Sequence, residues 1–201
     1  MNYSDRLNRV IPGGAHTYSR GDDQFPENAP QILSHGKGAY VYDPGGKKYL
    51  DYGMALRAVS IGYSEETITA AALRGLEAGN NLTRASTIEL EAAELIVNMI
   101  DSVDMVKFTK NGSTATSAAV KLARGFTGRK LVGRCTQHPF FSYDDWFIGN
   151  TPITKGIPDD VIRQTVQFDF NSIESLQDLI AKYGDDLACI ILEPAALNCP
   201  A

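Results

Sequence analysis

The chain has 201 residues, and its 43% of hydrophobic and 21% of charged residues are typical of a globular protein rather than a disordered or fibrous one. The formal net charge of −5, without a cluster of Lys and Arg, argues against a nucleic-acid partner. The three cysteines lack CxxC and metal-ligand spacings, so we expect free thiols, a reducing compartment and no metal site. There is no signal-peptide apolar stretch at the start and no apolar run of membrane-spanning length, so we expect a cytoplasmic protein without a membrane partner.

Apolar periodicity and turn signals predict a small N-terminal α+β lobe followed by an α/β layer with a mainly parallel sheet, because strands alternate with helices from residue 105 onward. The predicted elements, in chain order, are an irregular start to about residue 34, a hairpin of residues 38–43 and 48–52, helices at about 64–78 and 86–99, a short strand at 105–108, an Ala-rich helix to 124, a strand at 131–135, an aromatic loop at 138–158, a strand within 161–168, a helix at 171–183 and a final strand at 188–192.

A polar turn between the strand at 105–108 and the Ala-rich helix is the clearest chemical feature. Asn111, Gly112, Ser113 and Thr114 open a helix whose apolar positions, at 118, 119, 122 and 123, keep helical spacing. Free N–H groups at a helix N-terminus, with a glycine for close approach and hydroxyls beside it, suit an oxyanion such as phosphate. The alternative is an ordinary strand–turn–helix whose first turn is capped by Ser or Thr. The turn alone leaves both interpretations open.

The last predicted strand is followed directly by Glu193 and Pro194. An apolar run that ends in a carboxylate and a proline is typical of a buried parallel strand with a functional loop at its carboxyl end. Domains rarely end at such a point, so we expect the sequence to be truncated and to continue after Ala201.

Several short motifs occur in a characteristic order, at residues 12–14, 36–40, 50–53, 89–95, 108–129 and 191–194. With them the sequence resembles the N-terminal half of the class III, fold-type I, pyridoxal-phosphate (PLP) enzymes, and most of all the glutamate-1-semialdehyde 2,1-aminomutases and their aminotransferase relatives. The resemblance implies an α/β fold-type I PLP-transferase with helices on both faces of its sheet. It also implies a lobe segment at residues 1–60, with the β-hairpin, and an incomplete PLP-binding large domain at 61–201.

The resemblance assigns the cofactor phosphate to the polar turn. A Ser/Asn-Gly-Thr/Ser turn cradles the phosphate in the family, and Asn111, Gly112 and Ser113 match it here. An acidic residue usually comes next, whereas this sequence has Thr114, which alters the surroundings of the turn.

The family's Tyr-His-Gly motif, whose aromatic ring stacks on the pyridine, is less well matched. His138 aligns with its histidine, but Gln137 stands at the tyrosine position. His138 or Phe140 could cover the ring instead. The alternative is a loop histidine held by Pro139. Glu193, which marks the cofactor cleft in the family, could instead be a carboxylate that fixes the local turn.

Substrate contacts are implied near the N-terminus, where residues 15–20 resemble the aminomutase segment that meets the substrate. Thr17 lies in this segment, and Arg20 matches an arginine that pairs with the substrate carboxylate, as a guanidinium fork can. The alternative for Arg20 is a solvated loop residue. Leu56, beside Arg57, stands at a position where the aminomutases have a tryptophan. This departure puts glutamate-1-semialdehyde in doubt as the substrate. It favours a related enzyme that acts on another amino donor or acceptor.

The resemblance implies PLP-dependent amino-group transfer on a small amino, keto or aldehyde substrate, by an aminotransferase or an aminomutase that is a homodimer when intact. Lys107, Lys110 and Lys121 do not match the context of the family's Schiff-base lysine, so we interpret them as solvated or structural. That lysine and the aspartate that partners the pyridine nitrogen are expected beyond residue 201, and the chain alone is expected to be inactive. The alternatives are a non-catalytic remnant that binds a phosphate ligand or dimerises, and a phosphate-binding α/β protein of another family.

Overall fold

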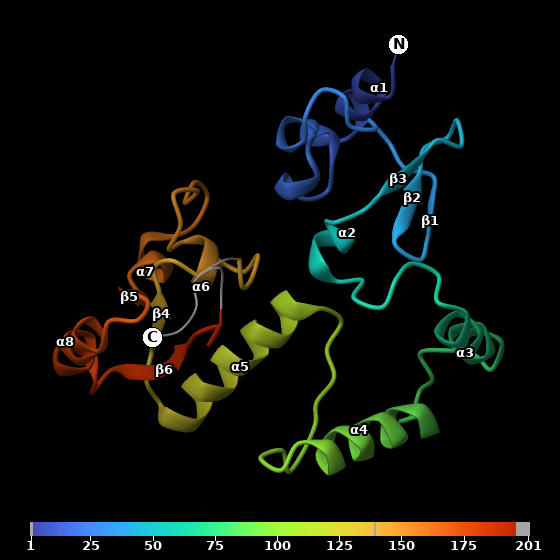
Figure 1. Cartoon of the computed structure of the whole chain (residues 1–201). Coiled ribbons are helices and arrows are strands. Elements are labelled where there is room, and N and C mark those ends of the chain that lie inside the picture. The colour runs from blue at the N-terminus through green and yellow to red at the C-terminus, as the bar shows by residue number, and fades with distance from the viewer. Residues whose placement is uncertain (1, 139, 196–201) are drawn as a thin grey trace. The chain divides into compact units, whose positions relative to one another are not determined.

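The computed structural model describes residues 2–138 and 140–195 (Figure 1). The chain divides into two compact units, Met1–Ser86 and Thr87–Ala201, and each is described by itself. The domain boundary that the resemblance implies at residues 60 and 61 stays a prediction. Within the described ranges, no helix has the length and apolar character needed to cross a membrane.

The first unit begins with a helix that the sequence patterns did not predict. Helix α1 (Tyr3–Val10) starts after Asn2, whose side-chain oxygen accepts a hydrogen bond of 2.8 Å from the Asp5 backbone N–H. Asp5 lies in the first turn and Arg9 in the last, which matches both charges to the helix dipole. The expectation of an irregular start was wrong here, because the cap and these charges stabilise a helix with few apolar residues. Three 3-10 turns follow, at Pro12–Gly14, Tyr18–Arg20 and Asp22–Gln24.

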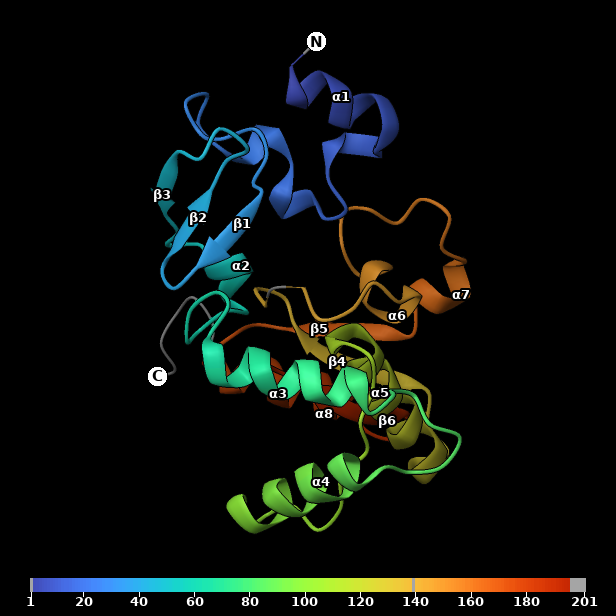
Figure 2. The ribbon, with the colours of Figure 1, turned by 90° about the vertical axis from the view of Figure 1, so that its right-hand side faces the viewer.

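A three-stranded antiparallel sheet contains the predicted hairpin (Figure 2). In the hairpin, Tyr40 pairs with Leu50 and Tyr42 with Lys48. Asp43 holds the turn, because its carboxylate accepts hydrogen bonds from the Lys47 backbone N–H at 2.9 Å and from the Tyr49 hydroxyl at 3.0 Å. The hairpin is confirmed, and a third strand that was not predicted pairs with its first strand. The strands are β1 (His35–Lys37), β2 (Tyr40–Tyr42) and β3 (Lys48–Leu50), in the order β1-β2-β3.

A left-handed turn and a long helix complete the first unit. The four residues of α2 (Met54–Arg57) all have positive φ, from 43° to 71°, although none of them is glycine. Helix α3 (Glu66–Glu77) confirms the helix predicted at 64–78. Its cap is Glu65, whose carboxylate accepts a hydrogen bond of 2.8 Å from the Ile68 backbone N–H.

The second unit opens with α4 (Thr87–Met99), which confirms the helix predicted at 86–99. The strand predicted at 105–108 is wrong, because these residues join neither sheet of the described chain. A strand needs a partner for its backbone N–H and C=O groups. Residues 105–108 pair with neither edge strand of the described parallel sheet, and the Met105 side chain is 90% exposed.

The remaining strands form the predicted parallel sheet, in the order β5-β4-β6. On one face Val132 packs with Val120, Trp146 and Phe147, and on the other Cys135 packs with residues of α8. Helices therefore cover both faces, as predicted, with α5 and α8 on opposite sides of the strands in Figure 1. The elements of this layer are α5 (Gly112–Thr127), β4 (Leu131–Cys135), α6 (Asp145–Ile148), α7 (Asp159–Ile162), β5 (Thr165–Phe168), α8 (Ile173–Tyr183) and β6 (Leu187–Ile191).

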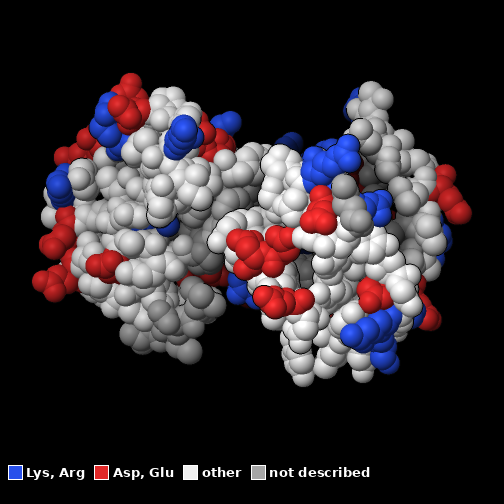
Figure 3. Space-filling view, turned by 90° about the horizontal axis from the view of Figure 1, so that it is seen from above, with Lys and Arg blue, Asp and Glu red and all other residues white. Residues whose placement is uncertain are grey.

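The buried side of α5 differs from the one that the apolar spacing marks. Leu122 is 74% exposed, whereas Ser117 and Val120 are buried. The helix thus turns a serine toward the sheet side and an apolar residue to solvent. Acidic and basic side chains are interspersed over the face seen in Figure 3, in keeping with the small net charge.

Candidate functional site

The polar turn lies at the N-terminus of α5, a helix of 16 residues. Asn111 is the N-cap, and its side-chain oxygen accepts hydrogen bonds from the Thr114 backbone N–H at 2.9 Å and the Thr114 hydroxyl at 3.0 Å. The first turn of α5 is therefore capped, but by an asparagine rather than by the Ser or Thr of the sequence alternative, and the described residues just before it form no strand. Thr114, which replaces the family's acidic residue, strengthens this cap.

Capping leaves two backbone donors unused. Among the described residues, no acceptor within hydrogen-bond distance faces the N–H groups of Gly112 and Ser113. A Cβ atom built on Gly112 would meet no atom within 4 Å, so there is open space beside this backbone. Because these N–H groups carry the positive end of the α5 dipole, the turn is suited to an anion.

The aromatic segment, residues 140–147, holds the first turn of α5. The Tyr143 backbone N–H donates to Ser113 Oγ at 3.3 Å, and the Ser142 hydroxyl donates to the Ser113 carbonyl at 3.3 Å. The Thr116 hydroxyl donates to the Phe141 carbonyl at 2.9 Å. Since Ser113 Oγ already accepts a bond from the protein, its own hydroxyl proton is available to a ligand.

His138 lies beyond the end of β4 and contacts Glu193. Its Nδ1 accepts a hydrogen bond of 3.2 Å from the Glu193 backbone N–H. Nδ1 is thus an acceptor, which assigns the proton of the neutral ring to Nε2. Burial lowers the pKa of His138, and the Glu193 charge opposes this shift only partly. The ring is therefore neutral near pH 7.

The Nε2 atom of His138 is buried and has no hydrogen-bond partner among the described residues. The ring makes edge contacts with Phe141 and Phe170, at centroid distances of 5.6 and 5.3 Å. A buried N–H donor without an acceptor is uncommon and is consistent with a ligand as the partner.

Gln137, at the family's tyrosine position, binds the loop after β5. Its amide donates to the Asp169 carboxylate at 2.9 Å and accepts from the Phe170 backbone N–H at 2.9 Å. Phe140, the other aromatic candidate, is 62% exposed and contacts Phe147 edge-on. Gln137 thus has a structural function that its position in the motif did not indicate.

Phe141 connects the polar turn with His138. Its carbonyl binds the Thr116 hydroxyl beside the turn, and its ring contacts His138. The sequence interpretation missed Phe141 and the buried side chains of Ser117, Ser142 and Trp146. For Ser117 a signal existed, because it lies four residues after Ser113 on the same helix face.

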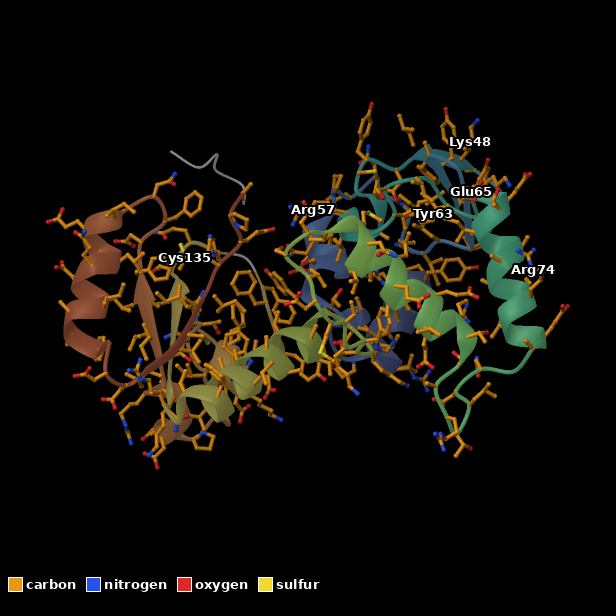
Figure 4. The ribbon with its side chains drawn as sticks, turned by 90° about the horizontal axis from the view of Figure 1, so that it is seen from below. Lys48, Arg57, Tyr63, Glu65, Arg74 and Cys135 are labelled. Atoms are coloured by element: carbon orange, nitrogen blue, oxygen red, sulfur yellow. The ribbon has the colours of Figure 1, made fainter. Side chains whose placement is uncertain are left out.

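Thr17 and Arg20 belong to the first unit, whereas the other site candidates belong to the second. Both are exposed, and within the described residues Arg20 forms no ion pair. Its charge acts to lower the pKa of Tyr63, but burial and the 2.5 Å hydrogen bond to Asp51 raise that pKa overall. Tyr63 and Arg57 are labelled in Figure 4, and Arg57 ends the left-handed turn of α2.

The three lysines considered for Schiff-base chemistry, Lys107, Lys110 and Lys121, are all exposed. Cys135, labelled in Figure 4, and Cys189 are free thiols, as expected. Cys199 lies outside the described residues.

A model of the family described as Aminotransferase class-III matches residues 22–160. The glutamate-1-semialdehyde 2,1-aminomutases of Alkaliphilus metalliredigens (strain QYMF) and Clostridium kluyveri are similar to the chain, with 33% and 32% identity. Each alignment covers 94% of this chain but only 44% and 46% of the relatives. The chain thus spans a little under half the length of these curated relatives.

Two solved structures show the same likeness. An omega-transaminase from Sphaerobacter thermophilus superposes with a TM-score of 0.86 at 27% identity. The match covers 96% of this chain and 47% of the transaminase chain. The FumI protein of Sphingopyxis sp. MTA144, in its PLP internal aldimine form, superposes with a TM-score of 0.84 at 32% identity. This match covers 94% of this chain and 44% of the FumI chain.

The second unit has a parallel sheet between α5 and α8, with the polar turn at the start of α5. Together with these superpositions, this arrangement defines part of a fold-type I PLP-dependent transferase. The matched family model makes the assignment more specific: the chain belongs to the class-III aminotransferase family.

Proposed function

We propose that this chain carries the phosphate-binding part of a PLP site in an enzyme that transfers amino groups. The observation that carries the proposal is the set of three unused donors at one turn, the N–H groups of Gly112 and Ser113 and the Ser113 hydroxyl. A phosphate dianion gains from several aligned donors and from the positive end of a helix. The open space beside Gly112 gives it room for close approach.

Each residue of the turn has a separate task in this proposal. Asn111 fixes the turn through Thr114, while Gly112 and Ser113 donate to the phosphate oxygens. When bound, PLP supplies an electron-withdrawing ring that stabilises charge on the substrate carbon next to the amino group.

His138 is proposed to lie against the ring of the cofactor. Its neutral imidazole offers a planar apolar face and one buried N–H donor at Nε2. The Glu193 backbone N–H fixes the tautomer, and Phe141 and Phe170 hold the ring in place. Glu193 is thereby proposed as a cofactor-site residue that acts through its backbone.

Thr17 and Arg20 are proposed to bind the substrate. Arg20 is exposed and free of ion pairs in the described part of the chain, so its guanidinium is available to a substrate carboxylate. The proposed substrates are small amino donors with keto or aldehyde acceptors, and the proposed intact enzyme is a cytoplasmic homodimer.

The lysine that would bond covalently to PLP is proposed to lie outside these 201 residues. The support is the exposure of Lys107, Lys110 and Lys121 and the share of under half that the chain covers in its relatives. Borohydride reduction of the chain with PLP, followed by peptide mass spectrometry, should label none of these lysines specifically. Stoichiometric labelling of a single one would contradict this part of the proposal.

A binding comparison tests the cradle itself. The chain should bind PLP more tightly than pyridoxal, which lacks the phosphate, as measured by equilibrium dialysis. Ser113→Ala should weaken PLP binding by about tenfold and leave pyridoxal binding unchanged, because it removes one charge-assisted donor. Ser172→Ala is the matched control, since it removes a serine hydroxyl from the N-cap of α8. Equal affinity for PLP and pyridoxal would overturn the proposal.

A further inference from the structure

A chain of buried hydrogen bonds runs from α6 to the first turn of α5. The Trp146 indole N–H donates to Ser117 Oγ at 3.0 Å, and the Ser117 and Ser142 hydroxyl oxygens lie 3.0 Å apart. The Ser142 hydroxyl then reaches the Ser113 carbonyl at 3.3 Å. The side chains of Trp146, Ser117 and Ser142 are all buried, and that of Ser142 is fully buried.

Both ends of this chain have a fixed direction. The Trp146 indole N–H can only donate, so Ser117 Oγ accepts from it. The Ser113 carbonyl can only accept, and either serine can be the donor between Ser117 and Ser142. We call this series, Trp146 to Ser117 to Ser142 to the Ser113 carbonyl, the hydroxyl relay.

The hydroxyl relay fixes the residue that is proposed to bind phosphate. Ser142 also accepts from the Asp144 backbone N–H at 3.0 Å, which holds the neighbouring backbone in place. That backbone brings the Tyr143 N–H to Ser113 Oγ. Ser113 is thus held at both its carbonyl and its hydroxyl oxygen, and only its hydroxyl proton remains free to turn toward a ligand.

Plain packing does not account for these side chains. The relay lies beside an apolar cluster that includes Val120 and Val132, where polar groups are costly to bury unless each is hydrogen-bonded. Alanine and phenylalanine would fill the same positions without that penalty. What the hydroxyls add is a fixed orientation, because a fully satisfied buried network favours one arrangement.

We propose that Ser117 and Ser142 are positioning residues for the phosphate cradle, and that Trp146 orients them through the hydroxyl relay. The inference rests on the proposed function, since it assigns the relay to the same turn. Neither serine touches the ligand. Their effect is to keep the Ser113 hydroxyl and the two free N–H groups aimed at a phosphate dianion, which lowers the second pKa of the bound phosphate below its free value of about 6.

Phosphorus NMR of PLP bound to the chain tests the relay. In the unmodified chain the ³¹P shift should stay at its dianion value as the pH is lowered from about 8 to about 5.5, either side of the free phosphate pKa. Ser142→Ala should restore a titration within this range and weaken PLP binding about three- to tenfold, as the loss of one or two hydrogen bonds predicts. Ser172→Ala should leave both the shift and its pH dependence unchanged.

A second variant separates positioning from folding. Ser117→Ala alone leaves the Trp146 N–H buried and unpaired, so it can destabilise the chain for that reason alone. In the double variant Ser117→Ala with Trp146→Phe, both members of this hydrogen-bonded pair are apolar, and the stability of the chain should largely return. If the relay positions the cradle, the ³¹P titration stays altered in this double variant although its stability is restored. If the titration returns to that of the unmodified chain, the relay is overturned while the cradle stands.

The two proposals fail differently. If the unmodified chain shows no preference for PLP over pyridoxal, the cradle itself is overturned and the relay with it. If that preference is clear and Ser142→Ala behaves like Ser172→Ala, only the relay is overturned.

Discussion

The two units of this chain are stabilised in different ways. In the first unit Val41 is the only buried hydrophobic side chain among the described residues, and the sheet depends on polar contacts such as those of Asp43 and Asp51. The second unit, over the residues that the structure describes, buries seven hydrophobic side chains on the two faces of a parallel sheet. Apolar burial is the larger stabilising force, so the second unit is expected to be the more rigid one.

This difference separates the two groups of proposed site residues. The phosphate cradle and His138 belong to the well-packed unit, where neighbouring side chains determine their orientation. Thr17 and Arg20 belong to the lightly packed unit and lie in an exposed segment. A cofactor that stays bound benefits from a rigid site, whereas substrates that come and go are bound more readily by residues that can adjust.

A matched pair of valine substitutions should give the largest contrast. Val132→Ala should lower the free energy of unfolding by about 2–3 kcal/mol, because it removes two methyl groups from a closed cluster. Val41→Ala should cost less than about 1 kcal/mol, since no buried hydrophobic cluster surrounds it. Urea denaturation followed by circular dichroism measures both. An equal or larger effect of Val41→Ala would contradict the comparison.

Asn150 should be the next most sensitive position. The Arg134 guanidinium is buried and is held by the Asn150 side-chain oxygen at 2.7 Å, and it lies 4.9 Å from the centre of the Phe147 ring. Asn150→Ala should cost about 2 kcal/mol in urea denaturation, because a charged donor loses its acceptor. Asn98→Ala, at an exposed position of α4, is the control and should change stability by less than about 0.5 kcal/mol. Similar values for the two variants would contradict this account of Arg134.

The pH dependence of stability should also differ between the units. Burial lowers the pKa of His138, so its contribution to stability is present above the unfolded pKa of about 6.5 and is lost as the pH falls toward the folded pKa. His138→Asn keeps an acceptor for the Glu193 N–H and should flatten the stability curve below about pH 6.5. The Tyr63 hydrogen bond lowers the pKa of Asp51, so the contribution of Asp51 to stability is present above the unfolded value of 3.8 and is lost as the pH falls below it. Asp51→Asn should therefore lower stability above pH 3.8 and flatten the stability curve below that value. Denaturation at a series of pH values measures both, and an unchanged curve for His138→Asn would refute the assignment.

The smallest effect is expected at Arg20. Arg20→Ala should change the free energy of unfolding by less than about 0.5 kcal/mol, because the side chain is exposed and forms no ion pair in the described residues. PLP binding by the chain should also stay unchanged. A loss of more than about 1 kcal/mol would show that Arg20 has a structural function in the first unit.

Local signals in the sequence were sufficient for most elements. Pro44-Gly45-Gly46 between two β-type runs predicted the hairpin, and alternating strands and helices predicted the parallel sheet, both of which are confirmed. Helix α1 was missed because its evidence is a cap and two charges rather than an apolar stripe. Residues 105–108 have strand-like composition, but whether a strand forms depends on a partner that composition does not reveal.

The site was harder to predict than the fold. The polar turn could be read directly, because its residues are adjacent in the sequence. The hydroxyl relay could not, because Ser117 is 25 residues from Ser142 and 29 from Trp146. Serine is usually an exposed residue, so the burial of Ser117 and Ser142 becomes visible only when α5 and the aromatic segment are packed together.

Trp146 has a practical consequence, because it is the only tryptophan of the chain. Its indole is buried and begins the hydroxyl relay, so the tryptophan fluorescence of the protein comes from a residue that is coupled to the polar turn. Loosening of the aromatic segment would admit water to the indole and shift its emission to longer wavelength. Every variant that keeps this residue therefore contains an internal optical probe of the proposed phosphate site, without any added label.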